Sequence, residues 1–362
     1  MTFYDVPLRV ETNPRENATD LLLSRVAKNP KHALFSRKNS DGSWRDVTAE
    51  DYLSEVQSLA KGLIASGIKP GDAVALMSRT RYEWTLIDFA VWFAGGVVVP
   101  IYETSSPAQI EWILSDSDSV ALFLENDEHL ERFNKISSNV KKVSKVWRID
   151  SKEFSDLHKS GEKISDADLE TARKNAEGPD LATIVYTSGT TGNPKGCELT
   201  HSSFVDHCKN AAAEVPELCN EFQRSLIFVP LAHIFGRYVA ALCIYSGVKV
   251  GHLGDTKMVA AELPGYKPTF LLAVPRVFEK VYNNAELKAE AGGKGNIFRA
   301  AAQTAIDYSK ALDDPKGPSL GLKVRHKLFD RLVFSKLRAA MGGEVKYAIS
   351  GGAPLGARLG HF

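Results

Sequence analysis

The sequence lacks paired cysteine motifs, long apolar runs and a large net charge of either sign, and each absence excludes a class of protein. The four cysteines form no CxxC pair, which is typical of reduced thiols in the cytoplasm. No apolar run approaches the roughly 20 residues that cross a bilayer, and the first residues do not resemble a signal peptide. The cysteines are Cys197, Cys208, Cys219 and Cys243.

Charge is balanced, with 45 basic and 44 acidic side chains and a net charge of +1. A nucleic-acid-binding protein concentrates positive charge to displace phosphate counterions, so no nucleic acid partner is expected. We therefore expect a soluble, cytoplasmic protein with at most peripheral contact at the inner membrane face. Its oligomeric state does not follow from the sequence.

The 362 residues suffice for two or three α/β units. From residue 47 to 72 the sequence predicts a helix with Thr48 as its N-cap, Asp51 in the capping-box position and a closing turn at Gly67. Apolar residues recur on one face of this helix. They are Leu53, Val56, Ala60, Leu63 and Ile64.

Short apolar runs then alternate with helical patterns, which predicts mostly parallel sheets with helices on both faces. We expect two sequential doubly wound subdomains, at residues 1–180 and 181–362. The first would end in a polar surface connection at 151–180.

Residues 287–340 form a basic insertion without strand signals. Its last part predicts a helix that either packs in the ordinary way, which is the simpler interpretation, or rests on an anionic membrane surface. The apolar residues near one face of this helix are Leu322, Phe329, Leu332, Val333 and Leu337.

The strongest signal is a ten-residue loop at 187–196, Thr-Ser-Gly-Thr-Thr-Gly-Asn-Pro-Lys-Gly, placed between an expected strand and the helix capped near Thr200. Glycines let backbone amides approach phosphate oxygens, hydroxyls add donors, and Lys195 supplies positive charge. The spacing matches neither a Walker A loop nor GxGxxG, so the loop predicts a nucleoside triphosphate site of another kind.

With this loop the sequence resembles the adenylate-forming superfamily, which contains acyl-CoA synthetases, luciferases and peptide synthetase adenylation domains. Two further stretches match in order, PLAHIFGR at 230–237 and ISGGAPL at 349–355. The resemblance implies that His233 lies beside the acyl carboxylate, that Lys195 acts in catalysis, and that Mg²⁺ lies near one threonine, taken as Thr187. The implied phosphate-binding residues are Thr187, Ser188, Gly189, Thr190, Thr191, Gly192 and Lys195, and the implied adenine-binding residues are Gly351, Gly352, Ala353 and Pro354.

Three segments resemble the long-chain fatty acyl-CoA synthetase branch, particularly its bacterial members: PIYETSSP at 100–107, PLAHIFGR at 230–237 and VPRVFEKVYNN at 274–284. This resemblance implies a fatty carboxylate that attacks the α-phosphorus of ATP, followed by attack of the coenzyme A thiol on the acyl-adenylate. Alignment and charge stabilisation would supply the catalysis. No enzyme nucleophile is needed, so Cys197 is expected to be a packing residue.

The chain stops at Phe362, whereas members of the superfamily continue with further adenine and ribose contacts and a mobile domain that carries a catalytic lysine. We therefore expect a truncated amino-terminal portion with little or no ligase activity. Two alternatives stay open. One is the activation of another acyl, aryl or amino acid, and the other is a non-catalytic module that binds ATP or fatty acid.

Overall fold

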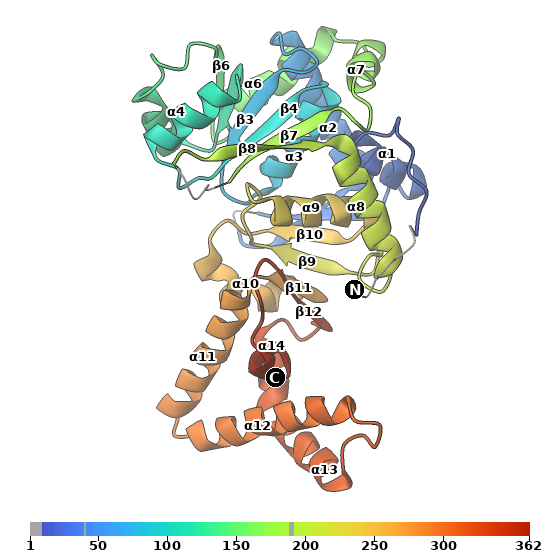
Figure 1. The fold of residues 1–362 in the computed structure, drawn as a ribbon, viewed down its shortest axis with the longest axis vertical. Coiled ribbons are helices and arrows are strands. Elements are labelled where there is room, and N and C mark those ends of the chain that lie inside the picture. Colours follow the sequence, from blue (N-terminus) through green and yellow to red (C-terminus); the bar gives the residue numbers. More distant parts are fainter. Residues whose placement is uncertain (1–8, 40, 188–191) are drawn as a thin grey trace, which may run out of the picture. The chain divides into compact units, whose positions relative to one another are not determined.

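The computed structural model describes residues 9–39, 41–187 and 192–362 (Figure 1). Compactness divides the chain into two units. The first comprises residues 1–223 and 229–254, and the second comprises residues 224–228 and 255–362. Each unit is described by itself.

The first unit is built on a six-stranded sheet with the order β6-β5-β3-β4-β7-β8. All neighbours in this sheet are parallel except β7 and β8, which are antiparallel. The inner strands β3, β4 and β5 are buried on both faces, as is usual in doubly wound α/β proteins. The strands are β3 (Ala73–Met77), β4 (Val97–Ile101), β5 (Ala121–Leu124), β6 (Lys145–Arg148), β7 (Leu181–Thr187) and β8 (Lys195–Thr200).

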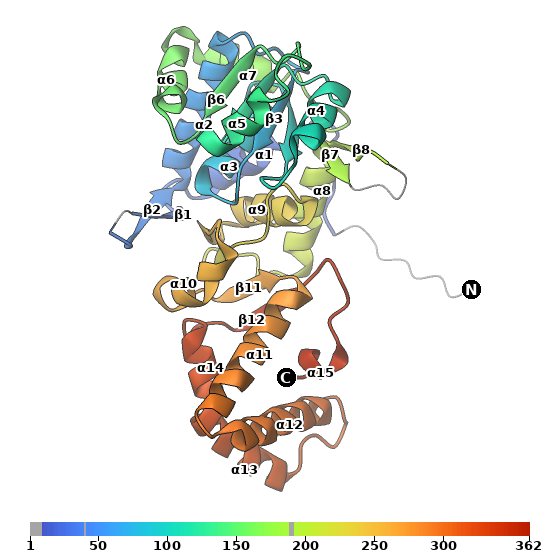
Figure 2. The same ribbon diagram turned by 90° about the vertical axis from the view of Figure 1, so that its left-hand side faces the viewer.

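Helices cover both faces of this sheet, which confirms the expected architecture. On one face, α4 (Pro107–Asp116) and α5 (Asp127–Asn134) lie together (Figure 2) and bury alternate strand residues such as Ala75, Val99 and Leu122. Four further helices pack against one another. They are α2 (Ala49–Ala65), α3 (Tyr82–Phe93), α6 (Lys152–Ser160) and α7 (Asp166–Arg173).

Helix α2 begins as predicted, because the Thr48 hydroxyl accepts a hydrogen bond from the Asp51 backbone N–H at 3.2 Å. Gly67 follows its end with a φ of 95°, a conformation that favours glycine. Val56, Ala60 and Leu63 are buried as expected, whereas Leu53 and Ile64 are only partly buried.

The division into compact units does not coincide with the expected boundary at residue 180. Strand β7 pairs with β4 through Val98 and Thr183, so residues 181–200 complete the first sheet. Residues 151–180, expected to be a surface connection, contain α6 and α7 and pack on α2 and α3.

A smaller sheet also belongs to the first unit. Strand β1 (Ala33–Lys38) pairs antiparallel with β2 (Trp44–Thr48) and parallel with β10 (Lys249–His252). Three helices accompany it and pack in succession: α1 (Thr19–Lys28), α9 (Ile234–Ser246) and α8 (His201–Glu214).

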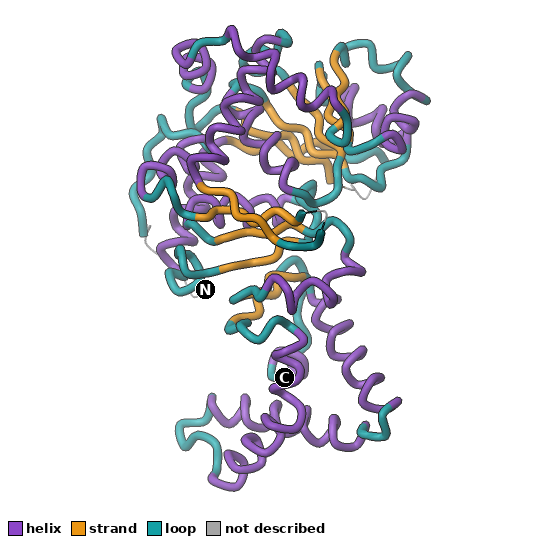
Figure 3. Tube along the Cα trace, turned by 180° about the vertical axis from the view of Figure 1, so that it is seen from behind, coloured by secondary structure: helices purple, strands orange, loops and turns teal. Residues whose placement is uncertain are grey.

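In the second unit, β11 (Phe270–Ala273) pairs parallel with β12 (Tyr347–Ser350), and β9 (Arg224–Ile227) is joined to β11 by a 2.9 Å bond from the Thr269 N–H to the Arg224 carbonyl. The insertion consists of helices joined by turns and contains no strand (Figure 3), in agreement with its lack of strand signals. Its elements are α11 (Pro275–Ala291), α12 (Gly295–Leu312), α13 (Leu320–Phe329), a π-helical turn (Asp330–Phe334) and α14 (Ser335–Ala340). The unit also contains α10 (Val259–Tyr266) and α15 (Ala357–Gly360).

Candidate active site

The glycine-rich loop connects two paired strands. Thr187 is the last residue of β7 and lies directly opposite Lys195, the first residue of β8, and both side chains are exposed. Ser188, Gly189, Thr190 and Thr191 lie outside the described residues, while Gly192 has a φ of 114°. The predicted helix cap at Thr200 is confirmed, because α8 begins there, but residues 195–200 between the loop and this cap form a strand that pairs with β7, which was not expected.

This geometry changes how the loop can bind phosphate. A helix N-terminus would add the positive end of a helix dipole. Here β8 separates the loop from α8, so any attraction for phosphate would come from the loop amides and hydroxyls and from the Lys195 ammonium group.

Helix α4 holds the base of the hairpin on both strands. The Trp112 indole N–H donates to the Pro194 carbonyl at 2.8 Å, and the Tyr186 hydroxyl donates to Asp116 Oδ2 at 2.7 Å. At Gly196 a Cβ atom would lie 2.8 Å from Ile184 Cγ2, which is too close for a methyl group. Sequence reasoning missed Trp112, because nothing local to the loop points to a helix some eighty residues earlier.

Cys197 is exposed on β8, so the expectation that it is a packing residue is wrong. Its sulfur lies 3.9 Å from the Thr187 hydroxyl oxygen. All four cysteines are free, and burial raises the pKa of Cys208 and of Cys243.

His233 is the N-cap of α9 and has an exposed side chain. Its Nδ1 accepts a hydrogen bond from the Phe235 backbone N–H at 3.1 Å. An accepting nitrogen carries no proton, so in the neutral ring the proton lies on Nε2. The cap therefore leaves His233 with an N–H donor that can act on a bound oxygen.

The segment before His233 is anchored by the first sheet. The Thr80 hydroxyl, which follows β3, donates to the Val229 carbonyl at 2.7 Å. At Gly236 a Cβ atom would lie 2.6 Å from the Pro230 carbonyl oxygen, so only glycine allows this close turn. These contacts fix the backbone position of the segment that contains His233.

Arg237, one turn into α9, is fully buried and ties three elements together. Its guanidinium group donates to both carboxylate oxygens of Asp88 on α3, at 2.9 and 2.5 Å, and to the Thr183 hydroxyl on β7. The rings of Trp84, Trp92 and Phe204 surround it at 5.0–5.7 Å. Thr183 lies on the strand that leads into the phosphate loop, so this cluster connects that strand to the helix that begins at His233.

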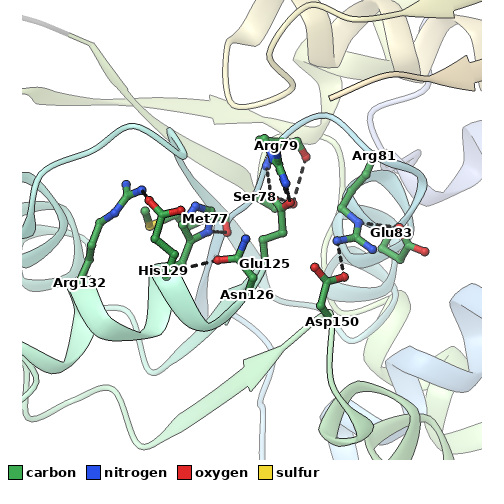
Figure 4. A network of polar contacts seen from close by, with 11 residues as sticks. Met77, Ser78, Arg79, Arg81, Glu83, Glu125, Asn126, His129, Arg132 and Asp150 are labelled. Atoms are coloured by element: carbon green, nitrogen blue, oxygen red, sulfur yellow. Dashed lines mark hydrogen bonds and ion pairs between the residues drawn. The ribbon is translucent and has the colours of Figure 1, made fainter. Parts of the chain in front are cut away.

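In open α/β sheets a ligand usually binds where the strand order reverses, outside the carboxyl ends of the strands. In this sheet the strand order reverses between β3 and β5, and an ion pair between Arg79 and Glu125 lies at the carboxyl ends of these two strands (Figure 4). Glu125 accepts from the Arg79 backbone N–H at 2.8 Å and from Arg79 Nε at 2.9 Å. The Arg79 guanidinium group lowers the pKa of Glu125 against the effect of burial. At this end of the sheet the charges of Arg79 and Glu125 are paired with each other, and the candidate phosphate site is the loop between β7 and β8.

The expected adenine-binding residues belong to the second unit. They follow β12 directly: Gly351 donates its N–H to the Ala273 carbonyl at 3.4 Å, and Gly352 has a φ of 79°. Gly352, Ala353 and Pro354 are exposed. Thr187, Lys195 and His233 lie in the first unit, so the two units carry separate parts of the expected site.

The described residues contain no group of three or more His, Cys, Asp or Glu side chains that could hold a metal ion. The Thr187 hydroxyl is one neutral oxygen. Such a donor set fits Mg²⁺ only when substrate phosphates and water supply most of its ligands, which is how Mg²⁺ usually binds with nucleotides.

The doubly wound sheet, with a glycine-rich segment and Lys195 between β7 and β8, is the arrangement expected of a nucleotide-binding α/β protein. Residues 23–362 match the protein family described as AMP-binding enzyme, and the chain belongs to that family.

Two curated relatives, the long-chain-fatty-acid–CoA ligases FadD15 of Mycobacterium bovis and Mycobacterium tuberculosis, are each 43% identical over 360 residues. The match covers 99% of this chain and 60% of each relative. The chain thus spans about three fifths of the length of these relatives.

Among solved structures, the fold is similar to the N-terminal domain of FACL13 from Mycobacterium tuberculosis, with a TM-score of 0.69 and 20% identity, over 95% of this chain and 72% of that one. It is also similar to a long-chain-fatty-acid-CoA ligase, FadD1, from Archaeoglobus fulgidus, with a TM-score of 0.67 and 21% identity, over 78% of this chain and 56% of that one.

Proposed function

We propose that the protein activates a long-chain fatty acid with ATP to form an acyl-adenylate and then transfers the acyl group to coenzyme A. The observation that carries the proposal is the hairpin that places Thr187 opposite Lys195 at the mouth of the ten-residue loop. The 43% identity to two proteins named long-chain-fatty-acid–CoA ligase supports the substrate class.

In the first step a fatty carboxylate oxygen attacks the α-phosphorus of ATP, the bond to the β-phosphate oxygen breaks, and pyrophosphate leaves. Lys195 and the loop amides bind the β- and γ-phosphates and stabilise the charge that builds on them. Thr187 would contribute a ligand to Mg²⁺, and the ion would supply further charge neutralisation when it is bound with the nucleotide.

His233 is proposed to orient the acyl group. Its Nε2–H, left free by the helix cap, donates to an oxygen of the fatty carboxylate and then to the same oxygen of the acyl-adenylate. In the second step the coenzyme A sulfur attacks the acyl carbon and AMP leaves. Gly351, Gly352, Ala353 and Pro354 are proposed to contact the adenine ring.

Calorimetry of this chain with a non-hydrolysable long-chain acyl-adenylate analogue tests the proposal, with an aryl-adenylate analogue as the comparison. Binding of the long-chain analogue alone supports both the adenylate site and the acyl class. Tighter binding of the aryl analogue would favour activation of a different acid.

A second measurement separates an enzyme from a binding module. In a chain that continues through the length of its curated relatives, called here the extended chain, Lys195→Ala should lower the rate of fatty-acid-dependent pyrophosphate exchange with ATP on the order of 100-fold or more. Lys174→Ala, which removes an exposed lysine directly after α7, is the control and should leave that rate unchanged. An extended chain that binds the analogue without any exchange would indicate a non-catalytic module.

We further propose that the protein acts in the cytoplasm. Four free cysteines, one of them exposed, suit a reducing compartment.

A further inference from the structure

Helix α13 and the π-helical turn after it carry a row of exposed aliphatic side chains. The exposed fractions are 79% for Leu320, 64% for Val324, 54% for Leu328 and 47% for Leu332. A spacing of four residues keeps these side chains along one side of the helix. Single exposed aliphatic residues are common, but a continuous row indicates a surface that binds something apolar.

The opposite side of this segment is packed, which fixes the orientation of the row. His326 stacks on Tyr308 of α12 with 4.1 Å between ring centroids, and Arg325 pairs with Asp307 of α12 at 3.0 Å. Phe334 is buried, and Phe329 and Val333 pack beside it against α12. Four of the five residues expected on one face of this helix are partly buried, namely Leu322, Phe329, Val333 and Leu337. Only Leu332 belongs to the exposed row.

The exposed row is flanked by positive charge. Residues 316–338 contain seven Lys or Arg side chains and one acidic residue, Asp330. Asp330 pairs with Arg338 at 2.7 Å. In the part of the chain that the structure describes, Lys323, Lys327 and Arg331 are exposed and form no ion pair with a carboxylate. We call this row and these three cations together the α13 face.

We propose that the α13 face binds the surface of an anionic lipid bilayer. An aliphatic row with Lys and Arg beside it matches both layers of such a surface, because the aliphatic side chains enter the acyl boundary while the cations meet lipid phosphates. A nucleic acid would use the cations but not the aliphatic row, and a protein-binding surface is usually richer in aromatic side chains. No helix among the described residues is long and apolar enough to cross a membrane, so the contact is peripheral.

The test is sedimentation of this 362-residue chain with vesicles, without ATP or fatty acid, so that its result is independent of the proposed activity. Vesicles of phosphatidylcholine with 30% phosphatidylglycerol should bind the chain, and pure phosphatidylcholine should bind it at least tenfold more weakly. Lys323→Gln with Lys327→Gln should weaken binding to the anionic vesicles on the order of tenfold, and salt should have the same effect.

A second variant tests the apolar part. Val324→Ser with Leu328→Ser should also weaken binding on the order of tenfold or more. Both side chains are exposed, so the thermal midpoint should stay unchanged. The matched controls lie in the first unit: Phe222→Ser removes an exposed aromatic ring, and Lys135→Gln with Lys141→Gln removes two exposed charges. Neither control should alter vesicle binding.

Four results would overturn the proposal. The first is no binding to anionic vesicles, and the second is equal binding by the α13 variants and the controls. The third is self-association through this face, seen as a dimer in analytical ultracentrifugation that Val324→Ser with Leu328→Ser abolishes while vesicle binding persists. If the 362-residue chain binds the vesicles and the extended chain does not, the additional residues cover the α13 face. That result would also overturn the proposal.

Discussion

Arg237 on α9 and Asp88 on α3 form a buried ion pair in which two guanidinium nitrogens contact the two carboxylate oxygens at 2.9 and 2.5 Å. Removing one partner of such a pair leaves an unpaired buried charge. We therefore expect Arg237→Met to lower the free energy of unfolding by about 3–5 kcal/mol. Denaturant unfolding of this chain measures it.

The same pair allows stability and positioning to be separated. Arg237→Met with Asp88→Asn removes both charges and should recover part of the lost stability, because no buried charge is left unpaired. Pyrophosphate exchange by the extended chain should stay low in the double variant, since the hydrogen bond from Arg237 to Thr183, which joins α9 to β7, is still missing. Arg173→Met is the control, because Arg173 is a buried arginine that pairs with Asp20 and Glu170 away from α9. Recovery of exchange together with stability would show that the pair only stabilises the fold.

Trp112→Phe should weaken ATP binding while leaving the fold intact. The variant keeps an aromatic ring on α4 but loses the indole N–H that holds the Pro194 carbonyl, next to Lys195. We expect about a three- to tenfold rise in the dissociation constant for ATP, the equivalent of one hydrogen bond. Calorimetric titration measures it, and Trp147→Phe, a change on β6, should leave ATP affinity as it was.

Gly196→Ala should destabilise the hairpin. The added Cβ would meet Ile184 Cγ2 at 2.8 Å, so we expect a loss of about 1–3 kcal/mol in the free energy of unfolding. Ile184→Ala removes the clashing atom and should reduce the cost of the alanine. Gly321→Ala, placed on α13 where no atom lies within 4 Å, should instead stabilise by about 0.5–1 kcal/mol. An equal loss at both glycines would contradict the packing explanation.

Acid should destabilise the first unit before most carboxylates titrate. Burial lowers the pKa of His201 to about 4, and its Nδ1 accepts the Ala18 N–H at 3.2 Å. Between about pH 6.5 and 4 the unfolded chain binds a proton on this histidine and the folded chain does not, so stability falls as pH falls through that window. The slope should approach 1.4 kcal/mol per pH unit for this group.

His252, whose pKa burial also lowers to about 4, should add a similar slope. His201→Asn keeps an acceptor at the position and removes the titration, so urea unfolding of this variant between pH 7 and 4.5 should show a shallower decline. An unchanged decline would mean that other groups govern acid sensitivity.

Local patterns were enough to predict part of the fold. The Thr48 cap, the helix after it and the alternation that builds a doubly wound sheet depend on near neighbours in sequence, and the structure contains all of them. The hairpin was missed because the antiparallel pairing of 195–200 with β7 is a tertiary choice, and the sequence Lys-Gly-Cys-Glu-Leu-Thr carries only a weak strand signal.

The residues that support the candidate site were also beyond local reasoning. Asp88 and Thr183 lie 149 and 54 residues from Arg237, and Trp112 lies 82 residues from Pro194. Their roles depend on which side chains the sheet order brings together, and spacing along the chain does not encode that. The roles of the loop residues, of His233 and of 351–354 stay predictions.

The two nitrogens of the His233 ring have different roles, and this difference limits which residues can replace the histidine. Nδ1 starts a helix, a task that asparagine performs equally well. Nε2 carries the proton of the neutral ring, and an asparagine side chain is too short to present a donor at the same point. His233→Asn should therefore keep the native fold but lose the N–H donor that Nε2 provides.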